Sequence, residues 1–561
     1  MVTNYLLFLT SYFLIVLSVI GHGVLAIKVT KTNVSTDDIG FVGLVGIFFL
    51  ILYSYLTHFF IEHDYLHNII FIIIGLLSVY YFRFKILTKK NLIFLFLIFS
   101  IIFVAFIIFK THDDFGYYHF PYSHYLNKFS MIIGIGPLNH GFKTPSSIFY
   151  LNSLFYLPHL DYYLYHMGSI LVLGFSNIIL VSNIKKYLDK KDNNNLFFLN
   201  LLAFIFINIF FYRIAEHGTD RSAQILIFLF FIYILSLREH YEKFDNILPK
   251  LIILLSLIIS LKSFYILYFI FIIPFIYYIL KDNKAYLIDK IFRNPILYFS
   301  ILLGACVMLV YFFNTGCLLY PVQQTCISGI EWGIPKSEVS ALNTHYQWWS
   351  KAGGGPGYSH EIEKELYIQN LNWLSNWIDK YFFNKMSDFL LSLVFISIIL
   401  VIIFRSKKKK LINKNFKINL FYYFCIILLL IEWFYNHPSL RYGGFVIFAL
   451  IFFIPLSHLL SKYEISQNFG FKIMIIFFLV SSTFIGRNVD RIFYEQNFYK
   501  ANFKQNMFFF TDKKYFSIDT KLKDLFKIYN NCDFNINTCS NNEDFIIKKV
   551  YGKMILIRVR N

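Results

Sequence analysis

Charged residues are scarce in this chain. Only 15% of its 561 residues are Asp, Glu, Lys or Arg, whereas 57% are hydrophobic and the mean hydropathy is +0.56. Soluble domains carry about 25% charged residues, so the composition excludes the ordinary soluble class. The start of the chain has no basic stretch with a small-residue cleavage site, and we expect no cleaved signal peptide. Basic loops of a membrane protein account for the net charge of +19, so we expect no nucleic acid as a partner.

Long apolar runs fill most of the chain, and each is long enough to cross the hydrocarbon layer as a helix. The sequence therefore predicts an all-α polytopic membrane protein with about 14 transmembrane helices and membrane lipids around it. The expected spans are residues 4–27, 40–60, 66–82, 91–110, 161–182, 196–212, 222–237, 250–261, 263–280, 295–313, 388–404, 418–434, 443–459 and 471–486.

Lys and Arg divide unevenly between the connections. One alternating set of connections holds 26 of them, and the short connections of the other set hold 4. Since basic residues accumulate on the cytoplasmic side, loops 111–160 and 314–387 and the tail after residue 486 are expected outside the cytoplasm. Residues 250–261 form too short a run to cross at full length, and we expect a hairpin whose tip is Lys262.

The chain is expected to divide into five regions. These are N-terminal accessory spans (1–90), a core (91–313) with an acidic first outer loop (111–160), a large outer loop (314–387) with an interfacial helix over 361–382, C-terminal spans (388–486), and a small extracytoplasmic α+β tail (487–561) with a closing strand over 553–559.

The cysteines, the glycine run and the tryptophans give limited information about the function of the chain. Of six cysteines, Cys317 and Cys326 share the large outer loop, and Cys532 and Cys539 share the tail. Both pairs fall where disulfides can form, with free thiols as the alternative. The glycine run at 353–357 lacks the Gly-Lys-Ser/Thr ending of a phosphate loop. The six tryptophans favour a belt at the membrane interface over a platform for sugar rings.

Ionisable residues gather at the expected outer ends of the spans. They are Asp113, Asp114, His119 and His140 in the first outer loop, Glu216, Asp220 and Arg221 in the next, Lys262 at the hairpin tip, and Arg441 near the last. If the spans pack as one bundle, these groups converge on one face. Carboxylates can deprotonate a hydroxyl or hold a divalent cation such as Mg²⁺ or Mn²⁺, and Lys and Arg can neutralise a phosphate.

Simpler interpretations stay open for each group. The paired aspartates can be merely solvated, and Glu216 and Arg221 can form an exposed ion pair of little energetic weight. Lys262 can extend to lipid headgroups, and Arg441 can anchor a span.

With these residues placed, the chain over roughly 91–460 resembles the GT-C superfamily of polyprenyl-phosphate-sugar-dependent glycosyltransferases. The likeness is to bacterial relatives of protein O-mannosyltransferases and of the lipid A aminoarabinose transferase. It rests first on an acidic pair followed by tyrosines, Asp113-Asp114 with Tyr117-Tyr118, and on the later outer-loop carboxylates Glu216 and Asp220. It rests also on the pair Arg441-Tyr442 and on two expected surface helices, segments 117–131 and 145–154. The chain departs from the family pattern in placing the acidic loop after the fourth span.

The resemblance implies an enzyme of the bacterial plasma (inner) membrane with its active face outside. It would invert the anomeric centre while moving a sugar from a polyprenyl-phosphate carrier to an extracytoplasmic glycan, lipid or protein. Asp113 or Asp114 would be the general base or a metal ligand, with Asp113 preferred, and Glu216 or Asp220 the second carboxylate. The carrier phosphate would be held by Arg221, Lys262 and Arg441, and the substrates bordered by Tyr118, His119, His140 and Tyr442.

Two alternatives belong to other classes. An O-antigen polymerase or ligase type of protein also has many spans and a large outer loop, but relies on Arg and His there. A transporter or flippase for lipid-linked saccharides could use Lys262 and the carboxylates as a relay, although the sequence shows no internal repeat.

Overall fold

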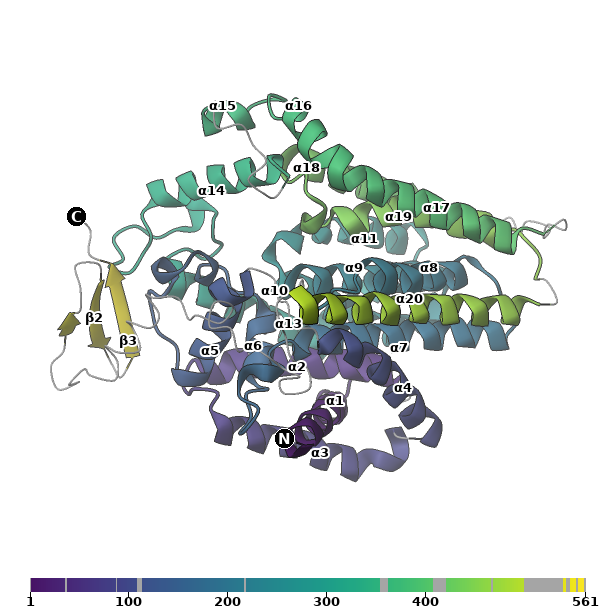
Figure 1. The fold of residues 1–561 in the computed structure, drawn as a ribbon, viewed down its shortest axis with the longest axis horizontal. Coiled ribbons are helices and arrows are strands. Elements are labelled where there is room, and N and C mark those ends of the chain that lie inside the picture. Colours follow the sequence, from purple (N-terminus) through teal and green to yellow (C-terminus); the bar gives the residue numbers. More distant parts are fainter. Residues whose placement is uncertain are drawn as a thin grey trace.

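The computed structural model describes residues 2–35, 38–86, 88–107, 114–215, 218–353, 362–406, 420–465, 468–498, 538–540, 545–550 and 553–558. Most of them are helical (Figure 1). The α-helices of the first half are α1 (Val2–Thr30), α2 (Ile39–His58), α3 (Tyr65–Ile86), α4 (Lys89–Phe106), α5 (Phe120–Lys128), α6 (Ser147–Ser153), α7 (Met167–Asp189), α8 (Asn195–Phe210), α9 (Gly218–Glu239) and α10 (Phe244–Leu261). Those of the second half are α11 (Ile272–Lys281), α12 (Tyr286–Arg293), α13 (Pro295–Thr315), α14 (Lys336–Lys351), α15 (Lys364–Ile368), α16 (Leu374–Trp377), α17 (Ser387–Phe404), α18 (Leu420–Asn436), α19 (Gly444–Ser461) and α20 (Phe469–Phe498).

Shorter turns of 3-10 or π-helix join these elements. They are η1 (Phe115–His119), η2 (Gly136–Leu138), η3 (His140–Phe142), η4 (Tyr162–Leu164), η5 (Tyr241–Lys243), η6 (Ser263–Phe271), η7 (Gln323–Thr325), η8 (Ile378–Met386) and η9 (Leu440–Tyr442).

Twelve helical segments within the described residues are long and apolar enough to cross a membrane. The chain is therefore a multi-pass membrane protein, and the predicted all-α architecture is confirmed. Each of the fourteen predicted spans coincides with a helix, but α8 and α18 have only 16 and 17 residues. At about 1.5 Å per residue they fall short of a layer of about 30 Å, so fourteen crossings stay a prediction.

Helix α2, in the predicted N-terminal region, packs closely against its neighbours. Helix α2 lies between α1 and α7, and most of its residues are buried. Its glycines allow this close packing: a Cβ on Gly46 would lie 2.1 Å from the Val19 carbonyl oxygen of α1, and one on Gly43 would meet the Phe175 ring of α7. Small residues at such contacts are typical of membrane helices.

The predicted hairpin around Lys262 is present, but its first helix is not short. Helix α10 begins at Phe244 and continues through Pro249, which lies inside the helix, about one turn and a half from its start. The chain returns as η6 and then α11, and η6 packs against α10. The sequence-based prediction began this span at the basic residue Lys250, whereas the helix begins six residues earlier and the Lys250 side chain is buried inside the bundle.

The single interfacial helix expected over 361–382 is wrong. Helix α15 ends at Ile368, the backbone of Asn370 takes a positive φ of 48°, and a new helical run through α16 and η8 continues into α17. Four of the six tryptophans are buried within the protein, namely Trp348, Trp373, Trp377 and Trp433.

A small antiparallel sheet closes the described chain. Its order is β1 (Thr538–Ser540), β2 (Phe545–Val550), β3 (Lys553–Arg558), so the predicted closing strand is confirmed. The outer edge of β3 pairs with the first outer loop, because the Ile133 N–H donates to the Met554 carbonyl at 2.9 Å and the Leu556 N–H donates to the Ile133 carbonyl at 2.8 Å. The predicted boundary at residue 486 falls inside α20, which extends to Phe498.

Candidate functional site

Two cations reach Asp220 from separate segments. Asp220 lies in the first turn of α9, where the positive end of the helix dipole favours a carboxylate. Lys262, at the tip between α10 and η6, places Nζ 2.6 Å from Asp220 Oδ1. Arg441 of η9 places Nε 3.3 Å from Oδ2. Both carboxylate oxygens are therefore engaged, and the Asp220 side chain is only 11% exposed.

Asp114 faces another part of the Arg441 guanidinium. Nη2 of Arg441 lies 3.7 Å from Asp114 Oδ2, and the Tyr118 hydroxyl donates to the same oxygen at 3.5 Å. Burial, with the nearby Asp114 charge, holds the pKa of Tyr118 well above its usual range, so Tyr118 remains a donor at neutral pH. Burial lowers the pKa of Arg441, but the Asp220 charge and its neighbours raise it overall, so Arg441 stays charged.

Polar and aromatic side chains hold the loop between α18 and α19 that carries Arg441. The indole N–H groups of Trp377 and Trp433 donate to two of its backbone carbonyls, at 2.6 and 2.9 Å. The hydroxyl of Tyr381 accepts from one of its backbone N–H groups at 2.7 Å, and Gln224 donates to the Arg441 carbonyl at 3.1 Å. Hydrogen bonds to four side chains therefore hold the backbone around Arg441 in place.

Further rings border this group of ion pairs. The Tyr442 ring centroid lies 5.9 Å from Lys262 Nζ and 5.4 Å from Arg441 Cζ, within the range of cation–π attraction. The His140 ring lies 5.2 Å from the ring of Tyr346 on α14. Burial lowers the pKa of His140 to about 4, so its imidazole is neutral at pH 7.

Two predicted substrate-binding residues lie beside the ion pairs rather than among them. The His119 ring packs edge-on against Tyr118, with centroids 4.4 Å apart. Arg221 turns toward the end of α8, where Nη1 donates to the Arg213 carbonyl at 3.2 Å and the guanidinium lies over the Phe211 ring. Arg221 therefore does not share Asp220 with Lys262 and Arg441.

Some predicted residues lie outside the described part of the chain. Asp113, Glu216 and Cys532 are among them, and the side chain of Cys539 is not described either. Within the described residues, no three His, Cys, Asp or Glu side chains gather as a metal-binding group. Asp114 and Asp220 both contact the cation Arg441.

Sequence reasoning missed several residues of this site. Gln224 lies one helical turn after Asp220, so the i, i+4 spacing on one helix face could have indicated it. Tyr346 lies on α14, in the large outer loop, and Tyr381 lies in η8, within the segment predicted as a single interfacial helix. No local pattern distinguishes these two tyrosines from the many others of the chain.

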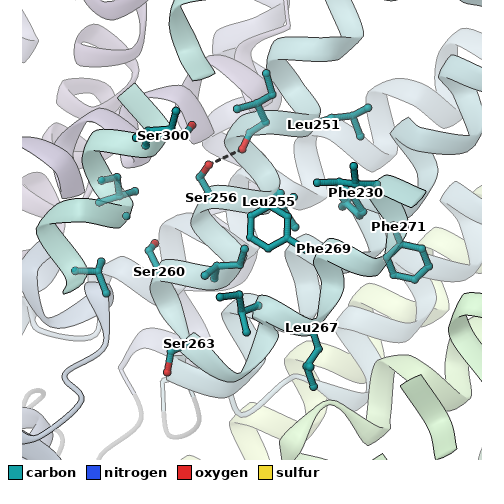
Figure 2. Close-up of a pocket in the computed structure, with 18 of the residues that line it drawn as sticks. Phe230, Leu251, Leu255, Ser256, Ser260, Ser263, Leu267, Phe269, Phe271 and Ser300 are labelled. Atoms are coloured by element: carbon teal, nitrogen blue, oxygen red, sulfur yellow. Dashed lines mark hydrogen bonds between the residues drawn. The ribbon is translucent and has the colours of Figure 1, made fainter. Parts of the chain in front are cut away.

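An apolar cavity opens beside the ion pairs. Its volume is about 890 Å³, and its walls come from helices α9 to α13, η6 and residues 319–322. Figure 2 shows hydrocarbon and phenyl side chains around it, with the hydroxyls of Ser256, Ser260, Ser263 and Ser300 as sparse polar groups. Ser263 directly follows Lys262, and His437, four residues before Arg441, also lines the cavity. The cavity wall therefore includes the residue next to Lys262 and a residue of the loop that carries Arg441, while neither cation itself lines the cavity.

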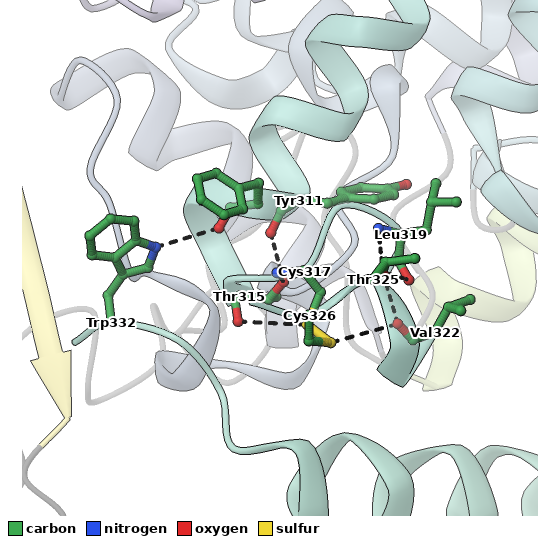
Figure 3. The surroundings of a disulfide bond; sticks show 9 residues. Tyr311, Thr315, Cys317, Leu319, Val322, Thr325, Cys326 and Trp332 are labelled. Carbon is green, nitrogen blue, oxygen red and sulfur yellow. Dashed lines mark hydrogen bonds between the residues drawn. A yellow bond between two sulfur atoms is a disulfide. The ribbon is translucent and has the colours of Figure 1, made fainter. Parts of the chain in front are cut away.

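A disulfide shapes the segment at the mouth of this cavity. Cys317 and Cys326 are joined just after α13, as Figure 3 shows. The enclosed turn is tied further by Thr325, whose hydroxyl bonds to Leu319. Leu319 and the next three residues line the cavity, so the disulfide holds part of its wall.

Residues 5–448 match a family described as a domain of unknown function, DUF8201. The chain belongs to this family. The match begins in α1 and ends in α19, so it includes the N-terminal helices and the loop that carries Arg441. It also contains Asp114, Asp220 and Lys262, whereas α20 and the C-terminal sheet lie beyond it. No curated protein and no solved structure matches the chain.

Proposed function

We propose that this protein is a membrane glycosyltransferase that moves a sugar from a polyprenyl-phosphate carrier to a hydroxyl of an extracytoplasmic glycan, lipid or protein. The observation that carries the proposal is a group of two cations and two carboxylates next to an apolar cavity whose wall includes Ser263, the neighbour of Lys262. A lipid-linked sugar phosphate has the matching parts: a long hydrocarbon chain, one anionic group and a reacting carbon beside it.

The cavity suits the prenyl chain. Its walls are almost wholly apolar, and burial of hydrocarbon there is favourable by about 25 cal/mol per Å². Some lining residues have large exposed fractions, among them Ile266 at 45% and Phe269 at 46%. In a membrane those exposed side chains meet lipid, so a carrier can enter sideways from the bilayer.

The ion pairs suit the phosphate and the transfer step. Lys262 and Arg441 would bind the phosphate, Arg441 with its forked donors. The acceptor oxygen bonds to the anomeric carbon, and the bond from that carbon to the phosphate oxygen breaks with its electron pair on the phosphate. Asp114, the more exposed of the two described carboxylates at 29% against 11%, takes the hydroxyl proton. Attack opposite the leaving phosphate inverts the anomeric centre.

The topology inferred from Lys and Arg supports an extracytoplasmic site. Lys262, Asp220 and Arg441 all lie in or beside connections of the lysine-poor set. With the resemblance to bacterial GT-C enzymes, this favours the plasma (inner) membrane of a bacterium, with donor and acceptor meeting at its outer face.

The test is transfer of radiolabelled sugar by the purified protein in proteoliposomes, with a panel of polyprenyl-phosphate sugars and envelope acceptors. Asp114→Asn is expected to lower kcat by about 100-fold or more, the usual scale for loss of a general base. Asp379→Asn removes an exposed carboxylate of η8 and should leave the rate unchanged.

Other outcomes point to other classes. Full activity of Asp114→Asn would remove the assigned base. Movement of a lipid-linked saccharide across the bilayer without any transfer product would favour a flippase. Glycan polymerisation that requires Arg441 but not Asp114 would favour the polymerase or ligase class.

A further inference from the structure

The cations that suit a phosphate are already occupied in this structure. Asp220 binds Lys262 at 2.6 Å and Arg441 at 3.3 Å, and it is the most buried of the four charged side chains. Lys262, Arg441 and Asp114 are each about 30% exposed, so they border the space that a substrate can enter. A carboxylate with two oxygens thus sits where the oxygens of a phosphate would make the same contacts.

The formal charge of the group is balanced without substrate. Among the described residues of this group, two cations face two carboxylates, so an entering phosphodiester would add an uncompensated negative charge to a partly desolvated place. Such a charge is costly unless a cation turns to it. Arg441 has Nε on Asp220 and Nη2 on Asp114, so the side of the guanidinium formed by Nε and Nη2 is not open to a phosphate while both contacts persist.

We propose that Asp220 is an intramolecular substitute for the donor phosphate: it holds Lys262 and Arg441 in place in the free protein, and the phosphate displaces it on binding. This inference rests on the proposed function and divides the two carboxylates by role. Asp114 is the base, whereas Asp220 is a positioning residue that acts through the two cations. The sequence-based assignment of Asp220 as a second catalytic carboxylate is replaced by this role.

The exchange has a consequence for turnover. After transfer the carrier leaves as a phosphomonoester, which has one more negative charge than the donor and would bind the two cations tightly. Return of Asp220 to Lys262 and Arg441 competes with that product and promotes its release. Without Asp220, the donor and the spent carrier should both bind more tightly, and release should become slower.

The experiment measures binding of a polyprenyl monophosphate to the full-length protein in detergent micelles, compared for wild type, Asp220→Asn and Asp114→Asn. Asp220→Asn is expected to bind about tenfold more tightly or better, the scale of one close charge pair. Asp114→Asn should change affinity less, because the contact of Asp114 with Arg441 is longer, at 3.7 Å. In transfer assays Asp220→Asn should lower both kcat and the donor KM, whereas Asp114→Asn should lower kcat alone.

The outcomes separate the two proposals. Unchanged or weaker binding by Asp220→Asn, with wild-type binding intact, overturns the displacement and leaves the proposed function standing. Absence of binding by folded wild type overturns both. If Asp220→Asn does not fold, Asp220→Ser provides the uncharged variant, and its affinity decides in the same way.

Discussion

The buried ion pair between Asp38 and Lys250 gives the sharpest prediction on stability. Lys250 Nζ lies 2.7 Å from Asp38 Oδ2, and the two side chains are 7% and 12% exposed. The ammonium also lies 4.8 Å from the Phe41 ring centroid and 5.0 Å from that of Tyr233. Lys250 lies twelve residues, or about 18 Å along α10, from Lys262, so changes here test the fold without touching the proposed site.

Loss of one partner leaves a buried charge unpaired, which costs about 3–5 kcal/mol. Lys250→Met keeps the length of the side chain and removes its charge, so we expect the free energy of unfolding to fall by that amount. Asp38→Asn should cost a similar amount while sparing the N-cap of α2, because Asp38 Oδ1 accepts from the Phe41 N–H and Asn caps equally well. The double variant removes both charges and should therefore recover most of the lost free energy of unfolding.

An exposed pair of the same length serves as the control. Lys290 Nζ lies 2.7 Å from Asp245 Oδ2, but the two side chains are 41% and 55% exposed. Water screens such a pair, and its coupling energy should lie within about 1 kcal/mol. Lys290→Met and Asp245→Asn, alone and together, complete the second cycle.

The assay is denaturant-induced unfolding in detergent micelles, followed by circular dichroism, for both double-mutant cycles. The reasoning predicts a coupling energy of several kcal/mol for Asp38 with Lys250 and little for Asp245 with Lys290. Additive losses in the first cycle, or equal coupling in both, would refute the claim that burial decides the strength of this pair.

Two further predictions concern the cavity and pH. Gly304 lines the cavity and has open space where a Cβ would lie. Gly304→Leu should therefore raise the donor KM in the transfer assay without unfolding the protein. The control is Gly486→Leu on α20, which also has open space at the Cβ position and should leave the donor KM unchanged. His140 has its pKa lowered by burial from 6.5 to about 4. The unfolded chain therefore binds a proton there between about pH 6.5 and pH 4 while the folded chain does not, and stability should fall as the pH is lowered through that window. A pH series of unfolding midpoints should be flatter for His140→Asn, and an identical slope would contradict the assignment.

Much of the fold follows from the apolar runs. Helices form at all fourteen predicted spans because a backbone in lipid must satisfy its hydrogen bonds within the segment. Lys262 at a turn and the strand over Lys553–Arg558 were also predictable, from a charge between two apolar runs and from β-favouring residues after a polar stretch. Sequence reasoning failed where a helix boundary depended on packing, as at Lys250, whose charge is neutralised inside the bundle by Asp38.

The sequence by itself determined that this chain is a multi-pass helical membrane protein and supplied Asp114, Asp220, Lys262 and Arg441 as candidates, because apolar length and isolated charges are local properties. Only the tertiary structure decided that Asp220 and Arg441, 221 residues apart, share an ion pair and that Arg221, adjacent to Asp220, points elsewhere. Neighbouring residues on a helix project in different directions, whereas distant segments meet through packing. Which charges gather, and beside which cavity, is therefore a property of the assembled bundle.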